Sequence, residues 1–214
     1  KNPLTPIQLA AERLKRKYLK FITEDQENYI RYVDTISKHV GDIGKMVEEF
    51  VSSARMSVPV FAKEDIGALV KKAVFSAQVA NPGIEYHMAM PEGPVWMLCD
   101  ERQMTQVMMN VLKNAAEAID EKFGAEGGKG RIAVALEPAA ERLKIMIEDN
   151  GAGFPGDDIQ KMMEPYVTTR SKGTGLGLSI VKKIVEDHKG LININNIDGG
   201  GARVTLSFLQ QCDI

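Results

Sequence analysis

Two glycine-rich clusters, preceded by a pair of asparagines, constrain the fold of this 214-residue chain more than any other feature. Asn110 and Asn114 are four residues apart in an apolar segment without glycine, so one face of a helix would present both side-chain amides. The clusters at 149–154 (DNGAGF) and 173–178 (GTGLGL) supply backbone that a phosphate-bearing ligand can approach closely. Together and in this order, the three elements predict one nucleotide pocket.

Length and charge narrow the classes of protein to which the chain can belong. The 27 Lys and Arg residues nearly balance the 29 Asp and Glu residues, so bulk charge gives no reason to expect nucleic acid or an anionic membrane as partner. No apolar run reaches the roughly 20 residues that span a bilayer, and no signal peptide opens the chain. Cys99 and Cys212 lack metal-ligand spacing, so we expect both to be reduced, structural thiols of a cytosolic protein; a longer parent protein could still carry membrane segments.

The first quarter of the chain has the apolar spacing of bundled helices. Apolar residues from Leu4 to Phe21 alternate steps of three and four, and the same period continues from Ile30 to Ala54 after a polar turn. This pattern predicts an antiparallel hairpin of two helices. Such a hairpin is too small to bury its whole apolar stripe, so we expect a homodimer with a four-helix bundle. The alternative is that the stripe packs on the rest of the same chain.

Pro59 ends the helical pattern and divides the chain into domains at 1–57 and 58–214. In the second domain, Asp100 is at an N-cap position. Periodicity predicts helices at 66–79, 101–119 and 176–187, and strands at 84–90, 95–98, 131–137, 143–148, 192–197 and 202–208. The fold class is therefore α+β: a helical hairpin followed by an α/β sandwich, in which helices cover one face of a mixed sheet.

The chemistry of the asparagine pair and the first cluster suits Mg²⁺ and ATP. Mg²⁺ takes oxygen ligands and usually bridges nucleotide phosphates, so Asn110 and Asn114 are candidate ligands, with Lys113 as a phosphate partner. The Asp149 carboxylate can accept a hydrogen bond from the amino group of adenine, and Gly151 and Gly153 keep the loop small. The structural alternatives are solvated asparagines and an Asp149 that caps the next helix.

The segment between the clusters, 164–172, is rich in hydroxyl and cationic side chains, and we interpret it as a mobile lid over the γ-phosphate. Gly175 and Gly177 open a helix whose N-terminal N–H groups suit a phosphate. The Gly-Lys-Ser/Thr ending of a Walker P-loop is absent. The candidate nucleotide-binding residues of this part of the chain are Tyr166, Thr169, Arg170, Lys172, Gly173, Thr174, Gly175, Leu176 and Gly177.

Segments 110–114, 149–154, 164–170 and 173–177 resemble the N, G1, F and G2 boxes of bacterial two-component sensor histidine kinases, whose ATP-binding fold is shared with gyrase, Hsp90 and MutL. The first 57 residues resemble the dimerisation and histidine phosphotransfer hairpin of the same family. The stretches KNPLTPIQL and EPYVTTR are most similar to nitrogen-regulation kinases of the NtrY type. This resemblance implies transfer of phosphate from Mg·ATP to a histidine, and then to an aspartate of a response regulator.

The resemblance places the phosphoacceptor histidine three residues before Lys1, outside this sequence, so we expect the chain as given to bind ATP but not to autophosphorylate. Asn2 matches the family position that serves dephosphorylation of the response regulator. His39, His87 and His188 lack the family's sequence context. We interpret His39 as solvated, His87 as a strand residue, and His188 as a cation at a helix end.

Two other functions remain open. In an ATP-driven conformational clamp of the gyrase or Hsp90 class, nucleotide would close a dimer without phosphorylating a protein. In an adaptor, the helical bundle would dock a response regulator without catalysis, and the nucleotide boxes would be free to decay. The hairpin and the short lid argue against the first function, and the complete boxes argue against the second.

Overall fold

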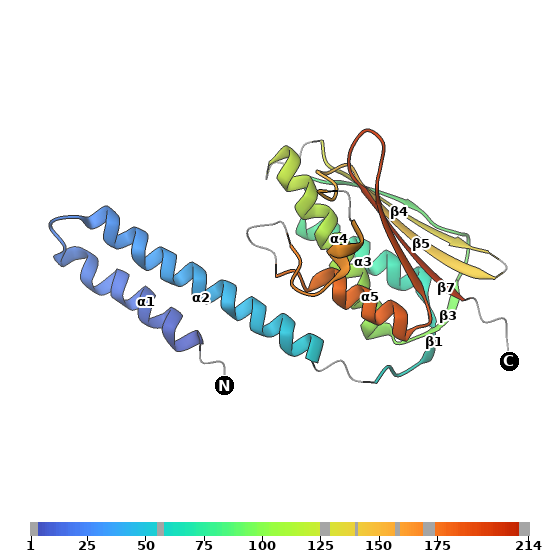
Figure 1. The fold of residues 1–214 in the computed structure, drawn as a ribbon, viewed down its shortest axis with the longest axis horizontal. Coiled ribbons are helices and arrows are strands. Elements are labelled where there is room, and N and C mark those ends of the chain that lie inside the picture. The colour runs from blue at the N-terminus through green and yellow to red at the C-terminus, as the bar shows by residue number, and fades with distance from the viewer. Residues whose placement is uncertain are drawn as a thin grey trace. The chain divides into compact units, whose positions relative to one another are not determined.

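The computed structural model describes residues 4–54, 58–124, 129–139, 141–156, 159–168 and 174–209. The chain forms two compact units, Lys1–Met56 and Ser57–Ile214. Figure 1 shows a pair of helices in the first unit, and helices packed on a sheet in the second. No helix among the described residues is long and apolar enough to cross a membrane.

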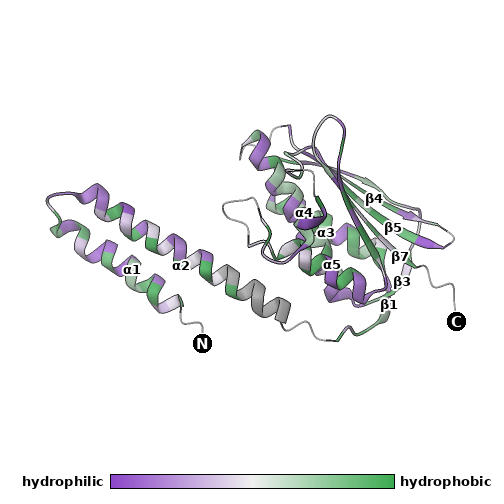
Figure 2. Cartoon of the chain, in the orientation of Figure 1, coloured by the Kyte–Doolittle hydropathy of each residue, from purple (hydrophilic) through white to green (hydrophobic). Residues whose placement is uncertain are grey.

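The first unit is a hairpin of helix α1 (Leu4–Tyr18), the 3-10 turn η1 (Leu19–Phe21) and helix α2 (Gln26–Ala54). Helix α1 packs along α2, and an ion pair of 2.6 Å joins Lys15 to Asp34. Figure 2 shows hydrophobic and hydrophilic residues alternating along both helices. Several apolar residues of the predicted seam are about half exposed in the single chain: Ile7, Leu14, Tyr18, Ile36, Ile43 and Val47.

The second unit is built on a five-stranded sheet in the order β2-β4-β5-β7-β6. Strands β2 and β4 pair in parallel, and the other neighbours pair antiparallel, so the predicted mixed sheet is confirmed. The strands are β2 (Glu85–Ala89), β4 (Arg131–Pro138), β5 (Arg142–Asp149), β6 (Leu191–Asn196) and β7 (Ala202–Leu209).

Helices α3 (Ile66–Ala80), α4 (Glu101–Phe123) and α5 (Gly177–Asp187) cover one face of this sheet (Figure 1). Strands β4, β5 and β7 alternate buried and more exposed residues, as expected where one face of a sheet is covered. The core between the layers includes Ile132, Val134, Ile145, Ile147, Leu206 and Phe208.

One strand prediction was incomplete. Strand β3 (Trp96–Cys99) forms as expected, but it pairs antiparallel with β1 (Ala62–Asp65) and stays outside the main sheet. The β1 sequence, Ala-Lys-Glu-Asp, lacks the β-branched residues that mark strands, so pairing with β3 determines its conformation. Cys99, the last residue of β3, is completely buried. Its burial, together with the nearby carboxylates of Glu64, Asp100 and Glu101, raises the pKa of the thiol to about 12.

Candidate functional site

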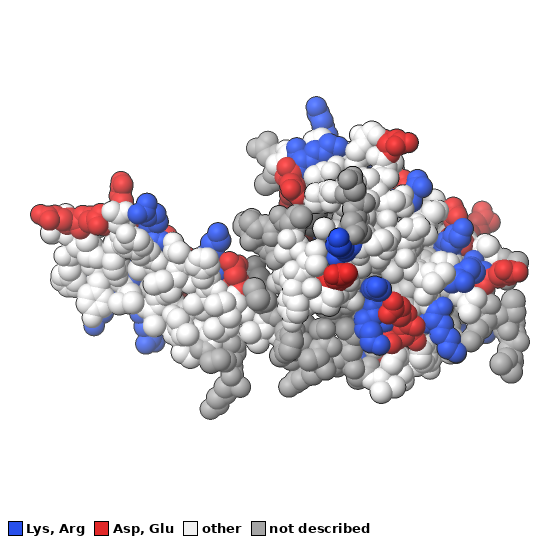
Figure 3. Space-filling view, in the orientation of Figure 1, with Lys and Arg blue, Asp and Glu red and all other residues white. Residues whose placement is uncertain are grey.

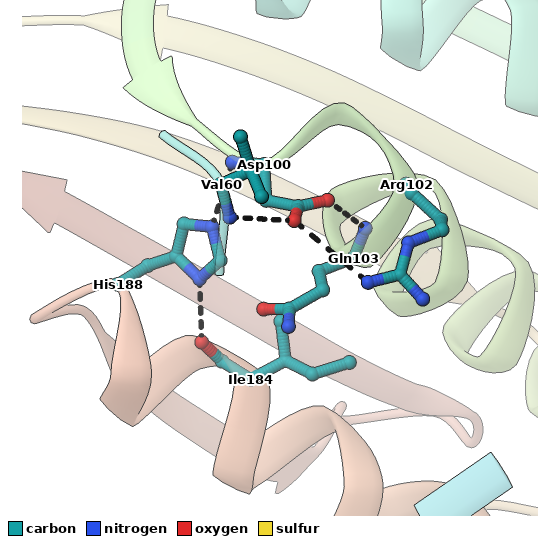
Figure 4. Close-up of polar contacts among 6 residues, drawn as sticks. All are labelled: Val60, Asp100, Arg102, Gln103, Ile184 and His188. Atoms are coloured by element: carbon teal, nitrogen blue, oxygen red, sulfur yellow. Dashed lines mark hydrogen bonds and ion pairs between the residues drawn. The ribbon is translucent and has the colours of Figure 1, made fainter. Parts of the chain in front are cut away.

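Helix α4 begins at a buried carboxylate that also holds the incoming chain. The N–H of Gln103 donates to Asp100 Oδ1 at 3.0 Å, which confirms the predicted N-cap, and the N–H of Val60 donates to Oδ2 at 2.9 Å (Figure 4). Burial acts to raise the pKa of Asp100, but these hydrogen bonds and the nearby Arg102 outweigh it and lower the pKa below its ordinary value. The start of α4 is thus anchored to the segment that enters the second unit.

His188 differs from its predicted role as a cation at a helix end. It is buried at the end of α5, with Nδ1 2.8 Å from the carbonyl oxygen of Ile184, while the N–H of Asp100 donates to Nε2 at 3.1 Å (Figure 4). Because Nε2 accepts this hydrogen bond, Nδ1 carries the ring hydrogen and donates it to the Ile184 carbonyl. The edge of the Phe61 ring packs on it. His188 therefore ties the end of α5 to the start of α4.

At its other end, α5 meets the asparagine pair. Asn110 Nδ2 donates to the carbonyl oxygen of Gly177 at 3.5 Å, and a Cβ on Gly177 would lie 3.8 Å from Asn114 Oδ1. Both asparagines are half-buried, so the four-residue spacing directs both amides towards the first turn of α5. Lys113 is on the exposed side of α4, and its Nζ lies 3.9 Å from Glu117 Oε1.

The first glycine cluster follows β5 and packs against α4. Asp149 Oδ1 accepts a hydrogen bond of 2.8 Å from the N–H of Gly151, so the carboxylate closes a turn on its own loop. The 3-10 helix η2 (Ile159–Met163) follows further along the chain. A Cβ on Gly151 would lie 2.5 Å from the backbone of Ala118, and the N–H of Ala152 donates to the Ala118 carbonyl at 3.0 Å. Glycine is required there because α4 and the loop touch through their backbones.

The second cluster meets the predicted lid at Tyr166. The N–H of Tyr166 donates to the carbonyl oxygen of Gly175 at 3.0 Å, and both residues have φ near +70°. Leu176 is buried, precedes α5 and gives it no side-chain cap, while its N–H donates to Thr174 Oγ1 at 3.4 Å. The lid residues Thr169, Arg170, Lys172 and Gly173, and also Asn2 and Cys212, lie outside the described residues.

The side-chain oxygens that the asparagine pair offers to a metal ion are neutral amides. Within the described ranges, no group of three or more His, Cys, Asp or Glu residues could hold a metal ion. A hard cation at Asn110 and Asn114 would therefore depend on neutral amide oxygens and on the phosphates of its ligand, a combination that suits Mg²⁺. On the face shown in Figure 3, Lys and Arg are interspersed with Asp and Glu over the second unit.

Comparison with known proteins agrees with this geometry. The model of the histidine kinase-, DNA gyrase B- and HSP90-like ATPase family matches residues 99–211. The nitrogen regulation protein NtrY of Azorhizobium caulinodans is 46% identical over 208 residues, which are 97% of this chain and 27% of that protein. The chain spans about a quarter to a third of the length of the curated relatives that it matches first.

Two solved structures share the fold over nearly the whole chain. Full-length ShkA in complex with AMPPNP has a TM-score of 0.69 at 21% identity, covering 99% of this chain and 44% of that one. Histidine kinase ThkA in complex with the response regulator protein TrrA has a TM-score of 0.68 at 20% identity, covering 97% and 57%. The chain belongs to the histidine kinase-, DNA gyrase B- and HSP90-like ATPase family, and within it to the sensor histidine kinases of the NtrY type.

Proposed function

We propose that this chain is the catalytic core of a sensor histidine kinase and binds Mg·ATP where α4, the 149–154 loop and the start of α5 meet. The observation that carries the proposal is the convergence of Asn110 and Asn114 on Gly177, beside a glycine loop packed on the same helix. This arrangement supports the proposal, because it brings together amide oxygens, which suit Mg²⁺, and the N-terminal N–H groups of a helix, which suit phosphate.

In this proposal each group has a defined task. Asn110 and Asn114 hold Mg²⁺, which when bound neutralises charge on the phosphates. The Asp149 carboxylate, oriented by the N–H of Gly151, accepts a hydrogen bond from the amino group of adenine. The first turn of α5 donates N–H groups to phosphate. Lys113 and the lid residues Tyr166, Thr169, Arg170, Lys172, Gly173 and Thr174 remain proposed phosphate contacts.

The wider activity follows from family membership and stays part of the proposal. The γ-phosphoryl group passes to a histidine that precedes Lys1 in the parent protein, with release of ADP, and then to an aspartate of a response regulator. Asn2 is proposed to serve hydrolysis of that aspartyl phosphate by water, which releases inorganic phosphate. The similar structure solved with AMPPNP supports ATP as the ligand, and the one solved with a response regulator protein supports a response regulator as the partner. The half-exposed seam of the hairpin supports a homodimer, and the parent protein is proposed to lie in the inner membrane.

The nucleotide site is tested by titrating the chain with Mg·ATP and Mg·GTP in a calorimeter. We expect Asp149→Asn to weaken ATP binding by about 10- to 100-fold, because a charged hydrogen-bond acceptor is worth about 1.5–3 kcal/mol. We also expect this variant to reduce the preference for ATP over GTP. Asp120→Asn, an exposed change on α4, is the matched control. Absence of Mg·ATP binding at millimolar concentration would contradict the proposal and favour an adaptor.

Phosphoryl transfer needs the parent sequence. A chain extended upstream of Lys1 is expected to form acid-labile phosphohistidine from labelled ATP, and Asn114→Ala is expected to abolish the labelling. Removal of Mg²⁺ with EDTA should have the same effect as the substitution. ATP hydrolysis by the extended chain without any phosphoprotein would instead identify a conformational clamp.

A further inference from the structure

Asn196, the last residue of β6, holds the first glycine cluster from the edge of the sheet. Its Oδ1 accepts a hydrogen bond of 2.7 Å from the N–H of Phe154, and its Nδ2 donates one of 2.9 Å to the carbonyl oxygen of Phe154. One side-chain amide therefore satisfies both backbone groups of a residue 42 positions away in the sequence. Only a side chain with a donor and an acceptor side by side can do this.

The loop is consequently held at two nearby points by two different elements. Ala152 is bonded to α4 through the Ala118 carbonyl, and Phe154 is bonded to β6 through Asn196. Gly153 lies between these points with φ +76°, and a Cβ there would come within 2.9 Å of Asn196 Oδ1. A residue with a side chain would have to adopt an unfavourable backbone conformation and displace Asn196 as well.

The turn after Asn196 packs closely against the start of the 149–154 loop. The N–H of Ile197 donates to the carbonyl oxygen of Gly201 at 3.0 Å, which closes the β6–β7 turn. Gly201 has φ +102°, and a Cβ on it would overlap the carbonyl oxygen of Asp149. The segment that begins at Asn196 thus contacts the loop at Phe154 and also at Asp149, the proposed adenine contact.

We propose that Asn196 is a positioning residue of the nucleotide site. It fixes the 149–154 loop so that the Asp149 carboxylate, which accepts a hydrogen bond from the Gly151 N–H, is held where it can accept another from the amino group of adenine. This inference rests on the proposed function. Asn196 is itself exposed, so water can replace its hydrogen bonds when it is removed. Its loss should therefore change the geometry of the loop more than the stability of the sheet.

Asn193 provides a matched control on the same strand. It is an exposed asparagine of β6, paired in register with Thr205, and it makes no side-chain hydrogen bond to another described residue. Asn196→Asp provides a finer test. The carboxylate can still accept from the Phe154 N–H, but its second oxygen would face the Phe154 carbonyl oxygen.

The test is calorimetric titration of the full chain and its variants with Mg·ATP and with Mg·GTP, together with thermal unfolding without nucleotide. We expect Asn196→Ala to weaken Mg·ATP binding about tenfold, because the released loop must then be ordered when nucleotide binds, and to lower the ratio of ATP to GTP affinity. Asn196→Asp should lose at least as much affinity for Mg·ATP as Asn196→Ala does. Asn193→Ala should bind Mg·ATP as tightly as the unmodified chain. Both alanine variants should unfold at the same temperature.

A nucleotide-free readout separates this inference from the proposed function. Hydrogen exchange at the Phe154 amide should become faster in Asn196→Ala and stay unchanged in Asn193→Ala. Equal ATP affinity of Asn196→Ala and Asn193→Ala would overturn the inference while leaving the proposed function intact. An unmodified chain that binds no Mg·ATP would overturn both, and a change in Phe154 exchange would then show that the hydrogen bonds exist but serve no nucleotide.

Discussion

The two units of this chain bury their apolar residues to different extents. The second unit encloses its apolar residues between helices and sheet, so that Ile145, Leu206 and Phe208 are fully buried. In the hairpin, Val33 and Val40 are buried, whereas Leu14 and many other seam residues stay half exposed. A sheet covered by three helices completes its core within one chain, and two helices alone do not. The stability of the hairpin should therefore depend on protein concentration, and that of the second unit should not.

The largest effect is expected from a substitution in the core of the second unit. Leu206→Ala should lower the free energy of unfolding of that unit by about 2–5 kcal/mol, because a fully buried leucine loses its contacts and leaves a cavity. Leu209→Ala on the same strand is the control, since that side chain is 52% exposed and should change stability by less than about 0.5 kcal/mol. Denaturant unfolding measures both, and similar losses would show that the assignment of the buried face is wrong.

The next effect tests whether a second copy covers the hairpin. Leu14 is 46% exposed in the single chain, yet it lies on the heptad seam of α1. If a partner buries it, Leu14→Glu should weaken dimerisation roughly 100-fold, because a charge would be placed in an apolar interface. Sedimentation equilibrium gives the dissociation constant.

Gln8→Glu is the matched control, since it adds the same charge at an exposed polar position of the same helix. We expect it to leave the dimer intact. A chain that is monomeric before substitution, or equal effects of the two changes, would mean that no second copy covers the seam.

Features set by local sequence were the ones that could be predicted. The mixed sheet with helices on one face followed from periodicity, and the asparagine spacing correctly directed Asn110 and Asn114 to one side of α4. The Asp100 cap was predictable because an N-cap needs only the residue itself and the N–H groups of the next turn. The cap and the asparagine pair depend on residues within a few positions of one another, and each strand was predictable from the alternation along its own segment.

Features set by contacts distant in sequence were missed. Strand β1 exists because β3 pairs with it, and its own composition disfavours a strand. His188 was interpreted from its place at a helix end, but its state depends on the N–H of Asp100, 88 positions away. Asn196 gave no signal at all, because its partner Phe154 belongs to another strand connection. The glycines of the first cluster were recognised, but the residues that hold them in place were not.

A smaller effect concerns the buried carboxylate at the start of α4. Asp100→Ala should destabilise the second unit by about 1–2 kcal/mol through loss of the cap. Because the pKa of Asp100 is lowered in the folded state, its ionised form adds stability above the ordinary pKa of about 3.9, and that stability is lost as pH falls through the lowered value. Asp100→Asn should therefore reduce the loss of unfolding free energy that acid causes, as measured by denaturant unfolding at several pH values. Asp120→Asn, an exposed change, should not.

The smallest effect concerns a carboxylate of the same type on the hairpin. Lys15 Nζ lies 2.6 Å from Asp34 Oδ1, a shorter contact than any made by Asp100, but both side chains are substantially exposed. Water and salt screen such a pair, so a double-mutant cycle of Lys15→Ala and Asp34→Ala should give a coupling of about 0.2–1 kcal/mol that weakens as salt is added. A larger coupling that resists salt would mean that the pair is buried in the assembled protein. The partner copy would then cover the flank of the hairpin as well as its apolar seam, and the contrast between the two units would hold only for the isolated chain.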